Sequence, residues 1–136
     1  MEFVGRIWKI WAPVIVWAAF IFALSAIPHL TTGLSCDFLL RKAAHVAEYF
    51  ILSYFLYRAI SGTFKFQGLH LSLSLAGAVF FYAASDELHQ FFITGRYASI
   101  HDVLIDLLGA VLFLAFLYLA SRVPALKLLP ALRAKK

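Results

Sequence analysis

Four long apolar runs take up most of this 136-residue chain. They predict membrane spans at approximately residues 8–27, 40–60, 69–92 and 100–120. Each run is close to the roughly 20 residues that a helix needs to cross the hydrocarbon core of a bilayer. Glycine and proline residues fall between the runs, where helices commonly end. We therefore predict an all-α integral membrane four-helix bundle that forms a single domain over residues 1–136.

The composition excludes the other common classes of protein. Hydrophobic residues make up 63% of the chain and charged residues 14%, against about 45–50% and about 25% in soluble domains. A water-soluble surface could not be covered with so few polar groups. The 14 Phe, 6 Tyr and 3 Trp also exclude a disordered chain. The single cysteine, Cys36, cannot form a disulfide within the chain.

The first run has some features of a secretory signal. Arg6 and Lys9 precede it, and small residues occur near its end, at positions 23–26. However, the run extends over residues 10–27, which is longer than the roughly 7–15 apolar residues of a signal peptide. We expect it to be a retained span.

Lysine and arginine are distributed unevenly between the two sides of the predicted bundle. With four spans, both termini lie on the same side as the connection at 61–68, and that side carries nine of the twelve cations. The positive-inside rule then predicts that both termini are cytoplasmic. The basic tail at 121–136 would rest on anionic lipid headgroups. It explains much of the net charge of +5, so we expect no nucleic-acid partner.

Six of the seven acidic residues fall on the opposite, extracytoplasmic side. These six are Asp37, Glu48, Asp86, Glu87, Asp102 and Asp106. With a rise of about 1.5 Å per residue, Glu48 lies roughly 12 Å and Asp106 roughly 9 Å inside their spans. A charge at the centre of a membrane costs roughly 2.5–3.5 kcal/mol, so these groups must face one another or a wet cavity. The sequence thus predicts a polar site in the outer-leaflet half.

Helical spacing indicates which side chains of the second span belong to this site. Lys42, His45 and Tyr49 are separated by three and four residues and form one stripe, with Glu48 beside it. Ser25 ends the first span at the same level. We expect these five side chains to border the predicted site.

The third and fourth spans show the same spacing. Asp86 and Gln90 lie four residues apart and share one helix face, as do Asp102 and Asp106. Glu87 is rotated by about 100° from Asp86 and is expected to face elsewhere. Both pairs should point toward the stripe of the second span.

Structural explanations for some of these residues stay open. Ser99 and Asp102 have the spacing of a capping box at the start of the fourth helix. His45 and Glu48 could form a buried ion-pair network with Arg96, without any further function.

Three segments of the chain together resemble the VanZ-like family. Residues 41–50 hold a Lys and a His near the start of a span, residues 85–96 an Asp-Glu-x-x-Gln followed by Gly-Arg, and residues 99–109 an Asp followed by Gly. The matching positions are Lys42, His45, Asp86, Glu87, Gln90, Gly95, Arg96, Asp102 and Gly109. Asp106 stands where the family pattern has Asn. The resemblance implies a small bacterial protein of the cytoplasmic membrane that acts at its outer face and is associated with glycopeptide (teicoplanin) resistance.

The favoured hypothesis is a protein that binds or modulates an anionic envelope lipid or a lipid-linked cell-wall precursor. Lys42 and Arg96 would hold the phosphate, because charge-assisted hydrogen bonds are strong in a dry site. The predicted ligand-binding residues are Ser25, Lys42, Tyr49, Glu87, Gln90, Arg96, Asp102 and Asp106. No feature of the sequence indicates the oligomeric state.

The alternative hypothesis is an intramembrane enzyme that acts on a lipid headgroup or a cell-wall intermediate. His45 would be the general base, oriented by Glu48 or Asp86, and Arg96 would stabilise developing negative charge. Such a site could also use a divalent metal as cofactor, since imidazole and carboxylate ligands suit zinc or manganese. The candidate ligands are His45, Glu48, Asp86, Asp102 and Asp106.

Overall fold

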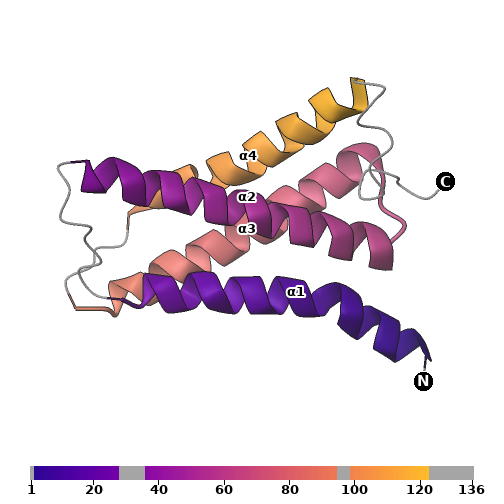
Figure 1. Cartoon of the computed structure of the whole chain (residues 1–136), viewed down its shortest axis with the longest axis horizontal. Coiled ribbons are helices and arrows are strands. Elements are labelled where there is room, and N and C mark those ends of the chain that lie inside the picture. Colours follow the sequence, from indigo (N-terminus) through magenta and orange to yellow (C-terminus); the bar gives the residue numbers. More distant parts are fainter. Residues whose placement is uncertain (1, 28–35, 95–98, 123–136) are drawn as a thin grey trace.

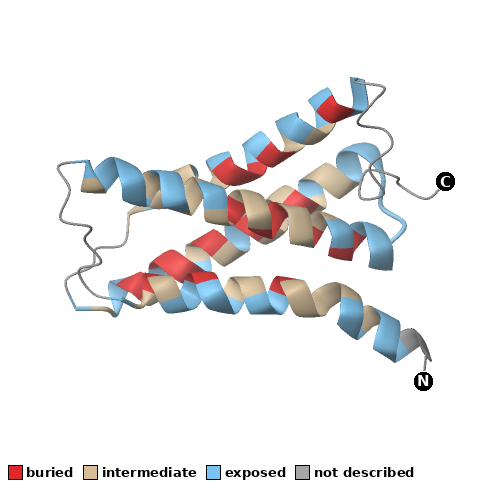
Figure 2. Cartoon of the chain, in the orientation of Figure 1, coloured by how far each residue is buried: buried red, intermediate tan, exposed pale blue. Residues whose placement is uncertain are grey.

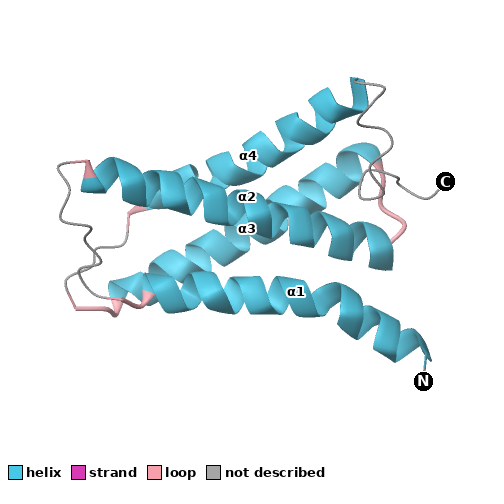
Figure 3. Ribbon diagram, in the orientation of Figure 1, coloured by secondary structure: helices cyan, strands magenta, loops and turns pink. Residues whose placement is uncertain are grey.

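The computed structural model describes residues 2–27, 36–94 and 99–122, and this part of the chain is almost entirely helical (Figures 1 and 3). The four helices are α1 (Glu2–Ser25), α2 (Asp37–Thr63), α3 (Gly68–Phe91) and α4 (Ile100–Arg122). No strand occurs among the described residues. The predicted all-α four-helix fold is confirmed. Helices α3 and α4 agree with the predicted ranges within two residues, α2 extends three residues further at each end, and α1 begins six residues earlier than predicted.

Three of the four helices are long and apolar enough to cross a membrane by themselves. These are α1 from Val4 onward, α3 and α4. Helix α2 is longer than any of them but carries several ionisable residues, among them Lys42, Glu48 and Arg58. It packs against all three other helices, so its neighbours cover part of its polar surface. The four-helix bundle therefore contains one member that depends on the others to lie in a membrane.

The packing of the bundle centres on α2 and α4, which share the most extensive helix–helix contact. Tyr49 and Leu52 of α2, Val79 of α3 and Phe113 of α4 are buried in the common core (Figure 2). Large apolar side chains point outward instead, including Val16, Phe81, Leu104 and Leu119. A bilayer solvates such an exterior, whereas water does not.

One glycine explains how closely α2 and α4 approach each other. A Cβ atom on Gly109 would lie 2.6 Å from the carbonyl oxygen of Val46 and 2.8 Å from the backbone nitrogen of Phe50. It would also lie 2.8 Å from Cβ of Tyr49. Small residues let helix backbones touch in this way in membranes. Gly109 therefore sets where α4 meets α2, one turn from the carboxylate of Asp106.

The ends of the helices alternate as an up-and-down bundle requires. Helix α1 begins, and α4 ends, at the same end of the molecule as the α2–α3 connection (Figure 1). The acidic ends of α2, α3 and α4 lie together at the opposite end. Which end faces the cytoplasm remains a prediction from the distribution of lysine and arginine.

Candidate functional site

Polar side chains from all four helices converge where α1 and α3 end and α2 and α4 begin. We name this group the polar cluster; its members are Ser25, Lys42, His45, Tyr49, Asp86, Gln90, Asp102 and Asp106. Each helix contributes at least one member. The convergence that the i, i+4 spacings predicted is thus present in the folded chain.

Asp86 joins α1 to α3 inside the bundle. The hydroxyl of Ser25 donates a hydrogen bond of 2.8 Å to Oδ2 of Asp86, and Nε2 of Gln90 donates one of 3.0 Å to the same oxygen. All three side chains are buried. The shared face of Asp86 and Gln90, predicted from their spacing, is therefore a direct contact that also holds the end of α1.

His45 and Asp106 join α2 to α4. Nδ1 of His45 lies 3.2 Å from Oδ1 of Asp106. The imidazole side chain is 22% exposed, whereas the carboxylate is only 1% exposed. The structure thus places Asp106, rather than Glu48 or Asp86, in hydrogen-bond contact with the histidine. An imidazole held by a carboxylate in this way has a fixed orientation.

Lys42 and Asp102 form a second link between α2 and α4, one turn nearer the end of the bundle. Nζ of Lys42 contacts Oδ1 of Asp102, and the two side chains are 23% and 28% exposed. We call this pair the mouth of the polar cluster, because it is open to the outside. The cluster becomes progressively drier from the mouth toward Asp106.

Three oxygen atoms deep in the cluster have no well-aligned hydrogen-bond partner among the described residues. They are the hydroxyl of Tyr49, Oδ1 of Asp86 and Oδ2 of Asp106. The residues that carry them are fully buried. Asp86 interacts electrostatically with the Tyr49 hydroxyl, whereas Asp106 lies close enough to that hydroxyl for a weak, poorly aligned hydrogen bond. Oδ1 of Asp86 is therefore the most clearly unpaired of the three atoms. We call these three residues the floor of the cluster. Unpaired buried polar atoms are rare in proteins and indicate a bound water, a ligand or a strained functional site.

Glu48 lies beside the cluster rather than in its hydrogen-bond network. Its carboxylate interacts electrostatically with His45. Its backbone carbonyl accepts a hydrogen bond of 2.9 Å from Nε1 of Trp17, which attaches α1 to α2. Glu48 therefore contributes charge to the site and an anchor point to the fold.

Glu87 faces away from Asp86, as its rotation predicted, and joins the end of α3 to the beginning of α4. Its Oε2 accepts a hydrogen bond of 2.9 Å from the backbone N–H of Ser99. The hydroxyl of Ser99 accepts one of 3.2 Å from the backbone N–H of His101. Ser99 thus caps α4, but Glu87 binds its N–H in place of Asp102, which faces Lys42. The capping-box alternative for Asp102 is therefore not what forms.

Two further predictions concern Arg96 and the metal ligands. Arg96 lies outside the described residues, so its assigned role stays a prediction. In the described part of the chain, no three His, Cys, Asp or Glu side chains lie where they could hold one metal ion. The five candidate ligands therefore form no metal site in this arrangement.

Tyr82 belongs to the surroundings of the site, although the sequence analysis did not single it out. Its hydroxyl donates a hydrogen bond of 2.5 Å to the backbone carbonyl of Ala18, and it interacts electrostatically with Asp86. Tyr82, Asp86 and Gln90 succeed one another at intervals of four residues, a signal that was available in the sequence. Three side chains of one α3 face thus contact α1 or the cluster.

Comparison with known families agrees with this arrangement. The sequence profile of the VanZ/LLP1 family matches residues 2–121. This chain belongs to the VanZ/LLP1 family. The match spans all four helices and therefore includes the whole polar cluster. Comparisons with curated proteins and with solved structures find no match.

Proposed function

We propose that this VanZ/LLP1 protein binds the polar headgroup of an anionic envelope lipid, or of a lipid-linked cell-wall precursor, in its polar cluster. The observation that carries the proposal is the group of buried floor oxygens that lack a well-aligned hydrogen-bond partner among the described residues, Oδ1 of Asp86 above all, beneath a partly exposed lysine. Polar groups this deep in a membrane bundle are costly, and they commonly mark a ligand site or pathway.

The two levels of the cluster suit two parts of such a headgroup. At the mouth, Lys42 can bind a phosphate, which offers more charge and more acceptor oxygens than the carboxylate of Asp102 that it now contacts. On the floor, the free carboxylate oxygens of Asp86 and Asp106 can accept hydrogen bonds from hydroxyl or amine groups. A headgroup with a phosphate and several hydroxyls or amines satisfies both levels.

The distribution of lysine and arginine predicts the side of the membrane to which the polar cluster opens. The positive-inside rule places both termini in the cytoplasm, so the polar cluster opens toward the extracytoplasmic face of the bacterial cytoplasmic membrane. Lipid-linked wall precursors are exposed at that face. A contribution to teicoplanin resistance, through binding or shielding such a precursor, is part of this proposal.

Mass spectrometry of the protein extracted with its native lipids tests the binding. We expect one phosphate-bearing lipid to be retained, and we expect Lys42→Met to lower its occupancy at least fivefold. Lys65→Met is the matched control, because Lys65 is an exposed lysine at the opposite end of the bundle. Unchanged occupancy in Lys42→Met, with the variant folded, would contradict the proposal. Arg96→Ala tests the second predicted cation in the same way.

The proposed contribution to teicoplanin resistance is tested by a separate measurement. The wild-type chain, expressed in a susceptible host, should raise the inhibitory concentration of teicoplanin, and Lys42→Met should return it to the level of the empty vector. An equal inhibitory concentration with and without the wild-type chain would contradict the role in resistance, but not the binding of a lipid.

The hydrogen bond between His45 and Asp106 favours a second candidate function. A carboxylate that orients an imidazole is the arrangement of a general base. His45 could then activate a water or a substrate hydroxyl against a bound headgroup. Comparing the lipids and wall precursors of cells that carry the wild type or His45→Ala tests this alternative. Identical profiles would exclude catalysis by His45 under those conditions.

A further inference from the structure

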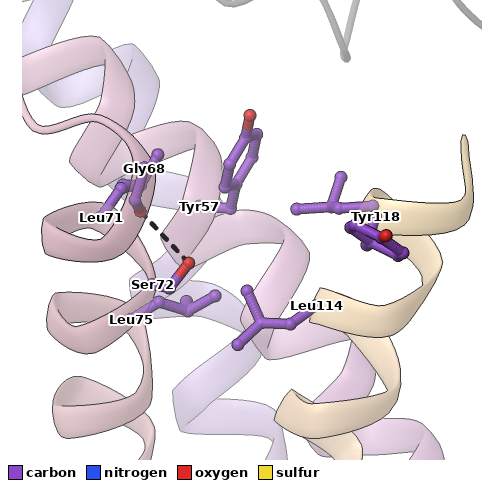
Figure 4. A pocket seen from close by; sticks show the side chains of 8 residues that line it. Tyr57, Gly68, Leu71, Ser72, Leu75, Leu114 and Tyr118 are labelled. Atoms are coloured by element: carbon purple, nitrogen blue, oxygen red, sulfur yellow. Dashed lines mark hydrogen bonds between the residues drawn. The ribbon is translucent and has the colours of Figure 1, made fainter. Parts of the chain in front are cut away.

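A second candidate site lies at the other end of the bundle. Here the structure contains a cavity of about 280 Å³ between α2, α3 and α4 (Figure 4). Its lining residues are Tyr57 from α2, Gly68, Leu71, Ser72 and Leu75 from α3, and Leu114, Leu117 and Tyr118 from α4. None of these described residues belongs to the polar cluster, so the cavity is independent of the function proposed above.

The wall of the cavity is apolar in character. Leu75 of α3 and Leu114 of α4 lie on facing sides, and Ser72 lies one turn from Leu75 on the α3 side (Figure 4). The hydroxyl of Ser72 donates a hydrogen bond of 3.3 Å to the carbonyl of Gly68 in its own helix, so it is already satisfied. An apolar cavity of about 150 Å³ can hold a molecule such as benzene. This larger one suits a length of hydrocarbon chain.

The position of the cavity decides what can fill it. Gly68 and Leu75 are separated by about 10 Å along the axis of α3, which is about one third of the hydrocarbon thickness of a bilayer. Both α3 and α4 are helices able to cross a membrane. These two helices supply all of the lining residues except Tyr57, so in a membrane the cavity lies among lipid chains rather than in water. An acyl chain of the nearer leaflet is therefore the natural occupant.

Arg122 lies next to the cavity, in contact with the lining residue Tyr118. We call this position the rim of the cavity. Nη2 of Arg122 donates a hydrogen bond of 3.0 Å to the hydroxyl of Tyr118, and the guanidinium lies 5.1 Å from the centre of that ring. Its described partner is thus a neutral phenol on the wall of the cavity. Every acidic residue from Asp37 onward belongs to the other half of the bundle. The rim is consequently suited to a negatively charged headgroup.

We propose that this cavity is a lipid site that takes one acyl chain of an anionic phospholipid, with the lipid phosphate bound near Arg122. Tyr118 holds the guanidinium in place, and the leucines of α3 and α4 contact the chain. On the orientation predicted from the cations, the lipid comes from the cytoplasmic leaflet.

Native mass spectrometry of the protein released from vesicles tests the acyl-chain site. The vesicles contain equal parts of phosphatidylglycerol and phosphatidylcholine. We expect one phosphatidylglycerol to remain bound, and we expect Ser72→Phe, which places a ring in the cavity, to lower this retention at least tenfold. Ser61→Phe is the matched control, because Ser61 makes the same kind of backbone hydrogen bond on an exposed helix face. Equal retention in Ser72→Phe and the wild type would overturn the proposal.

The anionic preference is tested at the rim. Arg122→Gln should reduce the ratio of bound phosphatidylglycerol to phosphatidylcholine about fivefold, as expected for the loss of one cation near a lipid headgroup. Arg58→Gln removes an exposed cation that stacks on Tyr54 and does not line the cavity, so it should leave the ratio unchanged. An unchanged ratio in Arg122→Gln would overturn the role of the headgroup.

A smaller substitution keeps the test available if Ser72→Phe does not fold. Ser72→Cys in a Cys36→Ser background carries one thiol, inside the cavity. Phosphatidylglycerol in the vesicles should slow the alkylation of this thiol by a membrane-soluble maleimide at least threefold relative to vesicles of phosphatidylcholine alone. Equal alkylation rates would overturn the proposal, whatever the result with the bulky variant.

Discussion

At one end of the bundle, hydrogen bonds and ion pairs tie the four helices together through the polar cluster. At the other end, α3 and α4 enclose an apolar cavity, and the contacts around it are made by leucine and tyrosine side chains. Lipid tails are as apolar as leucine, so apolar contacts between helices gain little from leaving lipid. Hydrogen bonds between helices still add stability there, on average about 0.6 kcal/mol each. A hydrogen bond of 2.9 Å from Nε1 of Trp11 to the hydroxyl of Thr63 also joins α1 to α2 at this second end. The comparison indicates that the polar end supplies most of the hydrogen bonds between helices, while the contacts around the cavity can be exchanged for lipid.

The polar end also contains the groups whose burial is unfavourable for stability. Asp86 and Asp106 are buried, and each has one oxygen without a described partner. A bundle built for stability alone would be expected to pair or omit them. Their retention at this end, and the absence of described carboxylates around the cavity, support a functional difference between the two ends.

The largest expected effect tests whether the α2–α4 contact holds the polar end together. Gly109→Ala should lower the free energy of unfolding by about 1–3 kcal/mol, as for overpacked cores, because its new methyl group would overlap the backbone of α2. The measurement is equilibrium unfolding in mixed detergent micelles. Gly77→Ala is the control: no atom lies within 4 Å of its Cβ position, so it should be neutral or stabilising by up to about 1 kcal/mol. Equal effects of the two variants would show that the close approach is unimportant.

A double-mutant cycle on Ser25→Ala and Asp86→Ala tests the buried link between α1 and α3. We expect a coupling energy of about 1–2 kcal/mol, because a hydrogen bond to a carboxylate is strong and water does not compete for it. The same unfolding assay measures it. A coupling near zero would mean that α1 is held by its other contacts, such as the hydrogen bond from Trp17 to α2.

Comparing Asp106→Asn with Asp102→Asn tests whether the floor and the mouth of the cluster differ in their effect on stability. The amide keeps an oxygen for His45 and replaces the unpartnered carboxylate oxygen with a donor near Tyr49. We expect a stabilisation of about 1 kcal/mol, the value of a typical added hydrogen bond. Asp102→Asn at the mouth should instead be slightly destabilising, because it removes the negative charge that pairs with Lys42. If Asp106→Asn destabilised the protein more than Asp102→Asn, the second oxygen of Asp106 would not be an unsatisfied hydrogen-bonding group.

The smallest effect concerns the mouth itself. A cycle on Lys42→Met and Asp102→Asn should give a coupling of only about 0.2–1 kcal/mol, as for partly exposed ion pairs. The coupling should fall further at high salt, since added ions screen exposed charges. A coupling that is as large as that of Ser25 with Asp86 and insensitive to salt would remove the distinction between mouth and floor.

Most of the fold and the membership of the site could be predicted from spacing within single helices. Lys42, His45 and Tyr49 share a stripe, and Asp102 and Asp106 share a face. Both sets point toward the same interface, as the structure shows. The pairing of His45 with Asp106 could not be predicted, because it depends on the relative register of two helices.

The cavity could not be predicted from the sequence either, for a related reason. Leu71, Leu75 and Leu114 look like ordinary core or lipid-facing residues in the sequence, and nothing in their spacing indicates that α3 and α4 separate there. The hydrogen bond from Ser99 to Glu87 likewise crosses between two helices. Within-helix periodicity carries no information about such distances.

The contact at Gly109 has a mechanical consequence. Two helices usually slide past each other through small rearrangements of the side chains between them. At Gly109 the backbone of α4 lies against the backbone of Val46 and Phe50 and against Cβ of Tyr49, so few side-chain atoms are available to rearrange. We therefore expect relative motion of α2 and α4 to be mainly tilting about Gly109, so that a ligand which widens one end of this helix pair would narrow the other.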